Sequence, residues 1–217
     1  MSHLAIALLG SFWVTLDGTP LAFATDKVRA LLAYLAVEAD RAQRREALAA
    51  LLWPGRPESA ARTSLRQALY RLRCTLGDRQ VALPHLSITA KDVQWNPAGG
   101  CWLDVAEFEA RIALCRTCRP GGQDLCPDCV TRLEAALQLY RGDFLTGFTL
   151  PACPDFEWWQ LCTQEACHRG ALEALHRLVV TMKRKGITPR SAATPAKRSS
   201  WSRGASPPTA GVCAPWP

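Results

Sequence analysis

The run TSLRQALYRLR, residues 63–73, constrains the fold of this chain more than any other stretch. Its leucines recur at the i, i+4 and i+7 positions, and Leu76 continues the row. This spacing predicts an amphipathic helix that buries its leucine side in a core. The opposite side carries mainly arginine, glutamine and tyrosine, which have to face water or a polar partner. The chain must therefore cover one face of this helix and leave the other open.

The residues before this helix predict a hairpin and two shorter helices. Residues 4–23 contain short apolar runs with Asp17-Gly18 between them, which favours a tight β-hairpin turn. Thr25 is placed to cap a helix, and a second helix covers residues 44–53. Pro54-Gly55 then ends that second helix.

The long helix is expected to begin after Ser59, a second capping candidate, and to stop at Gly77-Asp78. The brief β-prone runs VAL, LSIT and VQW follow, with a turn at residues 90–92. The order of elements is therefore a β-hairpin, three helices and a second β-hairpin.

Past residue 98 the pattern becomes helical. Residues 103–114, 133–148 and about 156–180 each carry apolar side chains at helical spacing. Helices of this kind stack as a repeat in which each one buries the face of its neighbour. The fold class predicted for the whole chain is mainly α with small β elements.

The charge is distributed unevenly along the chain. Residues 1–90 carry a net charge of +4, residues 91–182 a net charge of −4, and residues 183–217 a net charge of +7. This asymmetry indicates an anionic partner for the first half. No apolar run has the length of a membrane span, and LAIALLG near the start lacks the features of a signal peptide. We therefore expect a cytoplasmic protein without a membrane partner.

An enzyme is not expected. The four histidines show no nucleophile or metal-protease spacing, and no phosphate-binding glycine-rich loop is present. One class that remains is an interaction adapter without a nucleic-acid partner. It would use the helical half and a zinc-knuckle loop formed by the cysteines of residues 115–129.

The polar face of the long helix has the composition that duplex DNA requires. The major groove admits an α-helix, and long donors reach phosphates and base edges. The candidate residues on this face are Arg62, Thr63, Arg66, Gln67, Tyr70 and Arg71. A solvated helix that keeps its arginines for solubility is the competing interpretation.

Residues 4–96 resemble the OmpR-type winged-helix DNA-binding domain. KVRALLAYLA (27–36) is similar to the first helix of that family, and REALAALLWPG (45–55) to its second. ARTSLRQALYRLRCTLG (61–77) is similar to the recognition helix, and LSITAKDVQWNP (86–97) to the wing. The resemblance implies that residues 1–98 form a winged helix-turn-helix domain.

The resemblance also implies roles for individual side chains. Lys91, at the wing turn, would approach the minor groove beside the recognition helix. The residues expected to face the major groove are Arg62, Thr63, Arg66, Gln67 and Tyr70. The residues expected to contact phosphates are Lys27, Arg29 and Arg73.

Residues 99–182 resemble the bacterial transcriptional activator domain, a tetratricopeptide-like helical module of antibiotic regulatory proteins. WLDVAEFEA (102–110), LEAALQLYRGDFLTGF (133–148) and FEWWQLCTQEACHRGALEAL (156–175) carry the likeness. The two resemblances together imply a transcriptional activator that binds double-stranded DNA at repeated sites, dimerises there and contacts RNA polymerase. Compared with the family, this module looks incomplete at its C-terminal end.

Four cysteines in CRTCRPGGQDLCPDC (115–129) have the paired spacing of zinc knuckles. Two CxxC pairs can present four thiolates to a structural zinc ion, although the spacer between the pairs is short. The ligands would be Cys115, Cys118, Cys126 and Cys129. Reduced thiols in an insertion loop are the other interpretation.

The tail, residues 183–217, contains no acidic residue and is rich in proline, serine and alanine, so we expect it to be disordered. The family module continues with a stretch close to Glu-Leu-Glu-Pro-Trp-Arg-Glu. One set of synonymous codons for SSWSRGAS, residues 199–206, encodes that stretch in another frame. A frameshift shortly after Thr181 and a genuine basic arm that adds nonspecific DNA affinity are the two explanations.

Overall fold

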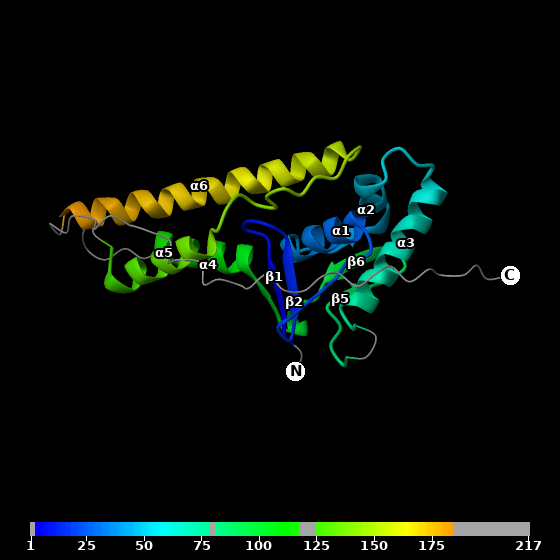
Figure 1. Ribbon diagram of the computed structural model, residues 1–217, viewed down its shortest axis with the longest axis horizontal. Helices are drawn as coiled ribbons and strands as arrows, with labels where there is room; N and C mark the ends of the chain where they lie inside the picture. The colour runs from blue at the N-terminus through cyan, green and yellow to red at the C-terminus, as the bar shows by residue number, and fades with distance from the viewer. Residues whose placement is uncertain (1–2, 79–80, 118–124, 185–217) are drawn as a thin grey trace, which may run out of the picture.

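The computed structural model describes residues 3–78, 81–117 and 125–184, and Figure 1 shows their arrangement. The elements in chain order are β1 (Leu4–Ala7), β2 (Trp13–Leu16), β3 (Thr19–Pro20), α1 (Asp26–Val37), β4 (Gln43–Arg44), α2 (Arg45–Leu52), α3 (Glu58–Thr75), β5 (Leu86–Ile88), β6 (Asp92–Trp95), η1 (Pro97–Gly99), β7 (Cys101–Leu103), α4 (Asp104–Thr117), α5 (Pro127–Leu139) and α6 (Pro154–Arg184). The predicted fold class, mainly α with small β elements, is confirmed.

Two small sheets frame the first three helices. One has the strand order β3-β2-β1-β7, and the other has the order β4-β6-β5. Leu16 pairs with Thr19, so Asp17 and Gly18 alone connect β2 to β3. Both have positive φ angles, 51° and 78°, which suits the strand twist of a two-residue hairpin turn. The Asp17-Gly18 turn is therefore confirmed.

The leucine face of α3 packs as the spacing predicts. Leu65, Leu69, Leu72 and Leu76 are all at most 3% exposed, and they lie in the same core as α1 and α2. Each such leucine contributes about 1.5–3 kcal/mol by leaving water. This packing fixes the orientation of α3 against the domain and leaves its polar side exposed to solvent.

Asp104 joins the two halves of the chain. It begins α4, is 0% exposed, and accepts hydrogen bonds from the Leu8 and Leu9 amides at 2.8–3.0 Å. Arg141, from the segment after α5, donates to the same carboxylate at 2.9 Å. The Leu145 amide also donates to the Leu8 carbonyl at 2.8 Å. The end of β1 is thus bound on both sides by the helical half.

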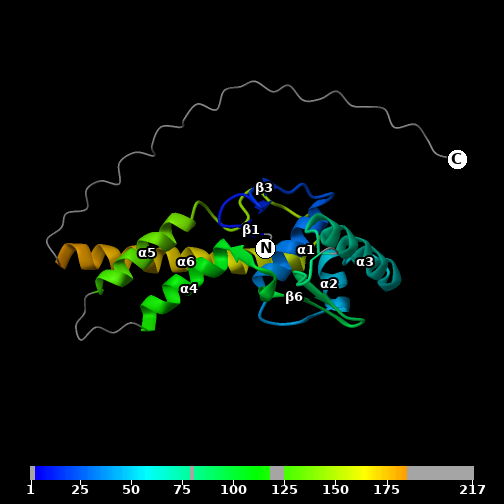
Figure 2. The ribbon, with the colours of Figure 1, turned by 90° about the horizontal axis from the view of Figure 1, so that it is seen from below.

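α6 is a single helix that contacts both halves (Figures 1 and 2). Near its start, Trp159 donates from Nε1 to Glu38 Oε1 at 2.9 Å and packs on Tyr34 with ring centroids 4.9 Å apart. Farther along, α6 lies beside α4 and α5, and Gly170 permits the close approach of Phe108. α6 therefore contacts both the first domain and the helices α4 and α5.

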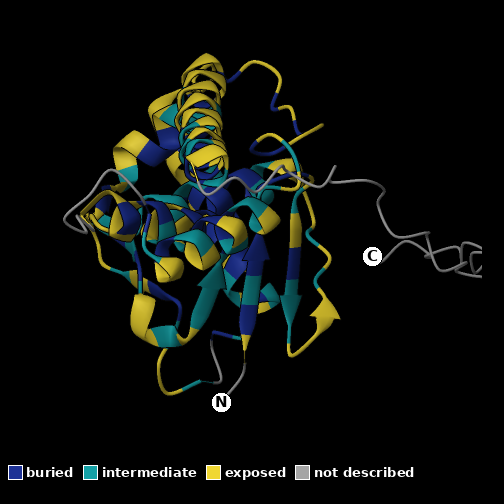
Figure 3. Ribbon diagram, turned by 90° about the vertical axis from the view of Figure 1, so that its left-hand side faces the viewer, coloured by how far each residue is buried: buried dark blue, intermediate teal, exposed yellow. Residues whose placement is uncertain are grey.

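A second side of α6 carries several exposed apolar side chains, and Figure 3 shows how much of this helix is exposed. We call this surface the outer face of α6. Its exposed fractions range from 40% to 68%, and its residues are Trp158, Leu161, Leu172, Leu175 and Val179. A helix with apolar residues on two sides is typical of the interior of a helical stack.

Five features differ from the sequence predictions. The helix predicted for residues 133–148 is α5, which ends at Leu139, so residues 140–148 are not helical. β7 pairs in parallel with β1, so the half predicted to be all-helical begins with a strand of the first sheet. VAL, residues 81–83, forms no strand. Ser59 lies inside α3, which begins at Glu58 with Pro57 at the N-cap position. Thr25 occupies the N-cap of α1, but its side chain forms no capping hydrogen bond.

The predicted tail overlaps α6. Lys183 and Arg184 form the last turn of that helix, and the rest of the tail lies outside the described residues.

Candidate nucleic-acid interface

The polar side of α3 is exposed over its whole length. The exposed candidates on it are Arg62, Thr63, Arg66, Gln67, Tyr70 and Arg71, while Arg73 is half-buried. In Figure 1, α4, α5 and most of α6 extend away from α3, so the acidic half does not cover this face. A helix fixed by leucines on one side can present these donors to a groove.

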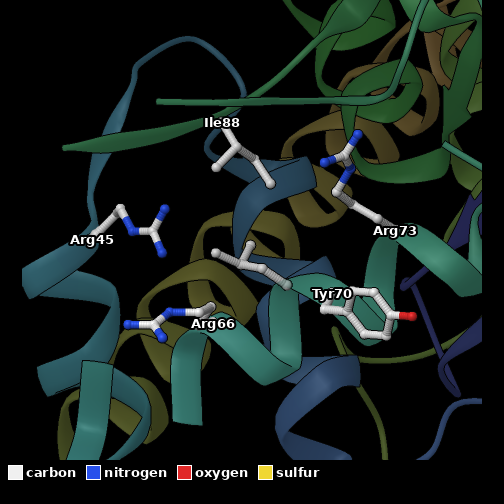
Figure 4. Close-up of a pocket in the computed structure, with 6 residues that line it drawn as sticks. Arg45, Arg66, Tyr70, Arg73 and Ile88 are labelled. Carbon is white, nitrogen blue, oxygen red and sulfur yellow. The ribbon is translucent and has the colours of Figure 1, made fainter. Parts of the chain in front are cut away.

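A hollow of about 310 Å³ lies between α3 and the β5–β6 hairpin, which is the second hairpin predicted from the sequence. Arg45, at the start of α2, shares it with Arg66 and Arg73, and Tyr70 lines it as well. Figure 4 shows Arg45 and Arg66 on one side of the hollow and Arg73 on the other, to the right of Ile88. Three guanidinium groups around one concave surface attract an anion such as a phosphate.

Arg45 is a candidate that the sequence reasoning missed. Its Nη1 donates to the Thr89 carbonyl at 3.1 Å, and its amide donates to the Lys91 carbonyl at 2.9 Å. β4 pairs with β6, and this pairing brings the start of α2 to the hairpin. The signal available in the sequence was a basic pair, Arg44-Arg45, immediately before an apolar helix.

The tip of the second hairpin is held by local hydrogen bonds. Thr89 Oγ1 accepts from the amides of Lys91 at 3.2 Å and Asp92 at 2.9 Å. Lys91 is exposed at this turn, as predicted for the wing. The tip is therefore a defined turn that carries one basic side chain outward.

Arg62 is engaged in surface ion pairs. It lies 3.0 Å from Glu46 and 2.6 Å from Glu58, and both carboxylates are more than half exposed. Exposed pairs contribute little, about 0–1 kcal/mol, so a phosphate could replace these partners. Thr63 donates its hydroxyl to the Ser59 carbonyl at 3.0 Å, which occupies that proton within the helix.

Lys27 and Arg29 do not join the α3 group. Lys27 donates to the Leu52 carbonyl at 2.6 Å and contacts Cys153 Sγ at 2.7 Å, where α1 meets the start of α6. Arg29 lies 3.3 Å from Asp26 and 5.7 Å above the Phe12 ring. Lys27 thus serves the contact between α1 and the start of α6, whereas Arg29 is partly exposed. The phosphate contacts of both residues remain predictions.

The zinc prediction falls partly outside the described residues, because Cys118 is not among them. Cys115 and Cys129 are both 0% exposed, and the Cys115 thiol donates to the Cys129 carbonyl at 3.7 Å. Cys126 caps α5 by accepting from the Cys129 amide at 3.3 Å. Within the described ranges, no three His, Cys, Asp or Glu side chains are grouped to hold a metal ion.

A structural zinc ion remains a prediction for these cysteines. We expect purified chain to contain about one zinc ion per molecule by elemental analysis. Cys126→Ser should remove the metal, because a structural site needs all four thiolates. Cys74→Ser, at an exposed position on α3, is the control and should leave the zinc content unchanged. A metal-free wild-type chain whose thiols all titrate would contradict the prediction.

Comparisons with known proteins point to one regulator. No family model matches the chain. Seventy-five of its residues are 40% identical to the transcriptional regulatory protein EmbR of Mycobacterium tuberculosis and of Mycobacterium bovis. The structure of M. tuberculosis EmbR in complex with a low-affinity phosphopeptide matches with a TM-score of 0.68 and 26% identity. That match covers 86% of this chain and 47% of the EmbR chain.

The fold is that of an OmpR-type winged helix followed by a tetratricopeptide-like helical module. EmbR is similar to this chain in both sequence and fold. The chain spans about half the length of the EmbR structure, and the sequence match covers 19% of the curated EmbR proteins. Among the described residues, no helix is both long and apolar enough to cross a lipid bilayer.

Proposed function

We propose that the chain regulates transcription by binding double-stranded DNA, with α3 in the major groove and the β5–β6 hairpin over the minor groove. The observation that carries this proposal is the arginine hollow beside the exposed face of α3. Arg66 and Gln67 would reach base edges, because both are exposed near the middle of the helix. Arg45, Arg73 and Lys91 would hold phosphates on either side.

EmbR supports the regulatory part of this proposal, because it is named a transcriptional regulatory protein and shares the fold. Activation, contact with RNA polymerase, dimerisation on repeated sites and a cytoplasmic location are further parts of the proposal. The chain would act without catalysis of its own, since its basic face suits binding rather than bond breaking.

Salt-dependent DNA binding tests the proposal. About six basic groups on or near α3 would replace counterions, so affinity should fall by about a thousandfold between about 50 and 200 mM salt. The measurement is a gel shift with duplexes selected from a random pool. Selection of no preferred sequence, together with a flat salt dependence, would overturn the proposal.

Lys91→Ala should weaken binding to all duplexes alike. Lys91 is exposed at the hairpin tip, so it would reach the phosphates rather than the base edges that α3 reads. The slope of log affinity against log salt should become shallower by about one. Lys183→Ala, in the last turn of α6, removes the same charge elsewhere and should leave the slope unchanged. A change of base preference in Lys91→Ala would mean that the hairpin reads sequence.

A protein-interaction adapter is the second candidate function. The outer face of α6 favours it, because soluble chains seldom leave such an apolar row uncovered unless something binds there. The same gel shift separates the two functions. A pure adapter would show no sequence-specific binding at any salt concentration.

A further inference from the structure

The contact between Lys27 and Cys153 is unlike an ordinary hydrogen bond. Lys27 Nζ lies 2.7 Å from Cys153 Sγ, whereas donors usually remain farther from a sulfur atom because sulfur is large. Cys153 is 0% exposed and directly precedes α6, while Lys27 is in the first turn of α1. The short separation brings an amine and a thiol together from two distant parts of the chain.

The Leu52 carbonyl orients both groups. It accepts from Lys27 Nζ at 2.6 Å and from the Cys153 thiol at 3.3 Å, so the three atoms form a small triangle. Holding both donors on one oxygen keeps nitrogen and sulfur side by side. Their separation matches that of a nitrogen and a sulfur bonded to one shared oxygen atom.

We propose that Lys27 and Cys153 form a covalent cross-link in which a single oxygen atom bridges the amine nitrogen and the thiol sulfur when the chain meets hydrogen peroxide. The site does not depend on DNA binding. The 2.7 Å separation favours this product over a direct S–N bond, because it leaves room for one oxygen atom between nitrogen and sulfur.

The reaction takes two steps that consume one peroxide molecule each. First, the S–H bond is exchanged for S–OH, and one peroxide leaves as water. Next, the O–H bond of S–OH and one N–H bond of the neutral amine break while an N–O bond forms. The second peroxide accepts both hydrogens with two electrons and leaves as two waters. Sulfur and nitrogen are each oxidised by two electrons.

A small oxidant can approach this region through a surface hollow, although neither Lys27 nor Cys153 lines it. A hollow of about 270 Å³ is lined by Trp53, which follows Leu52, and by Asp155, which lies two positions after Cys153. Hydrogen peroxide is close to water in size. Cys167 offers a contrast, because it is also buried but lies near the Glu109 and Asp104 carboxylates rather than an amine, and burial raises its pKa to about 12.

The cross-link would tie α1 to the start of α6. It would close a loop between residues 126 positions apart, which restricts the unfolded chain strongly. The temperature of unfolding should therefore rise by several degrees in the oxidised protein and return when a dithiol reductant is added.

Mass spectrometry of the full chain tests the proposal. Exposed thiols are first blocked with N-ethylmaleimide in the folded state, and the protein is then treated with hydrogen peroxide. We expect a peptide pair joined through Lys27 and Cys153. Its mass should equal the sum of the two peptides plus one oxygen atom and minus two hydrogen atoms. The pair should separate after treatment with dithiothreitol.

Three variants serve as controls. Lys27→Arg keeps the positive charge but lacks the reactive amine, and Cys153→Ala lacks the sulfur, so neither should form the joined peptides. Cys167→Ala should form them as wild type does. The proposal would be overturned if oxidised wild-type protein contained no joined peptides. It would also be overturned if Cys153 were found only as sulfenic, sulfinic or sulfonic acid. The wild-type result stands even if a variant fails to fold.

Discussion

Replacing Asp104 with alanine is expected to lower the free energy of unfolding by about 3–5 kcal/mol, the largest single effect on stability that we predict. The side chain is 0% exposed and accepts from the amides of Leu8 and Leu9 and from Arg141. Its removal leaves two buried amides without an acceptor, and each unpaired group costs about 1–3 kcal/mol. Urea denaturation followed by circular dichroism measures the change.

Two further variants make this prediction specific. Asp104→Asn keeps the shape and one acceptor oxygen but loses the charge, so its cost should be smaller than that of Asp104→Ala. Glu107→Ala, in the same helical turn, removes a partly exposed carboxylate that pairs with Arg111 and should change stability by less than about 0.5 kcal/mol. If Asp104→Ala and Glu107→Ala lowered stability equally, the loss would come from the negative charge removed from α4 rather than from the hydrogen bonds of Asp104.

Replacing Arg66 with alanine should weaken binding to a selected duplex by about 1–3 kcal/mol and broaden the base preference at one position. Arg66 is exposed on α3 and lines the hollow with Arg45 and Arg73. The guanidinium can donate two hydrogen bonds to a single base edge, which alanine cannot replace. Binding titrations on the selected duplex and on its single-base variants measure both effects.

Arg132→Ala is the matched control for this variant. Arg132 is an exposed arginine on α5, so its removal changes the net charge equally but at a distance from α3. It should leave base preference unchanged. If Arg66→Ala and Arg132→Ala behave alike, α3 does not read bases, and the proposed orientation on DNA is wrong.

The local pattern predicted α3 and its surroundings well. Leucine spacing identified the buried face of α3, and Asp17-Gly18 identified the first hairpin turn, because both signals lie within a few residues of the structure they specify. The side chains expected to face the major groove from α3 are exposed, whereas Arg73, expected to contact phosphate, is half-buried. Exposure follows directly from the period of the helix.

Features set by contacts between distant segments could not be predicted in the same way. Arg45 reaches the hollow because β4 pairs with β6, a register that no local signal encodes. Lys27 was predicted to contact phosphate from its position in α1, but it contacts the Leu52 carbonyl and Cys153, which lie far along the chain. β7 contributes only three residues, too few for a recognisable pattern, and its parallel pairing with β1 depends on the fold between them.

The attachment of α6 sets the spacing between neighbouring copies if the chain occupies tandem operators as proposed. A rod of 31 residues extends about 46 Å at about 1.5 Å per residue, and it is anchored to the first domain through Trp159 and Glu38. Each copy would then project its helical module at one fixed angle around the duplex. Inserting about five base pairs between two operators would turn the modules to opposite sides, because B-DNA repeats every 10–10.5 base pairs or so. Cooperative occupancy would accordingly vary with the phase of the operators as well as with their separation.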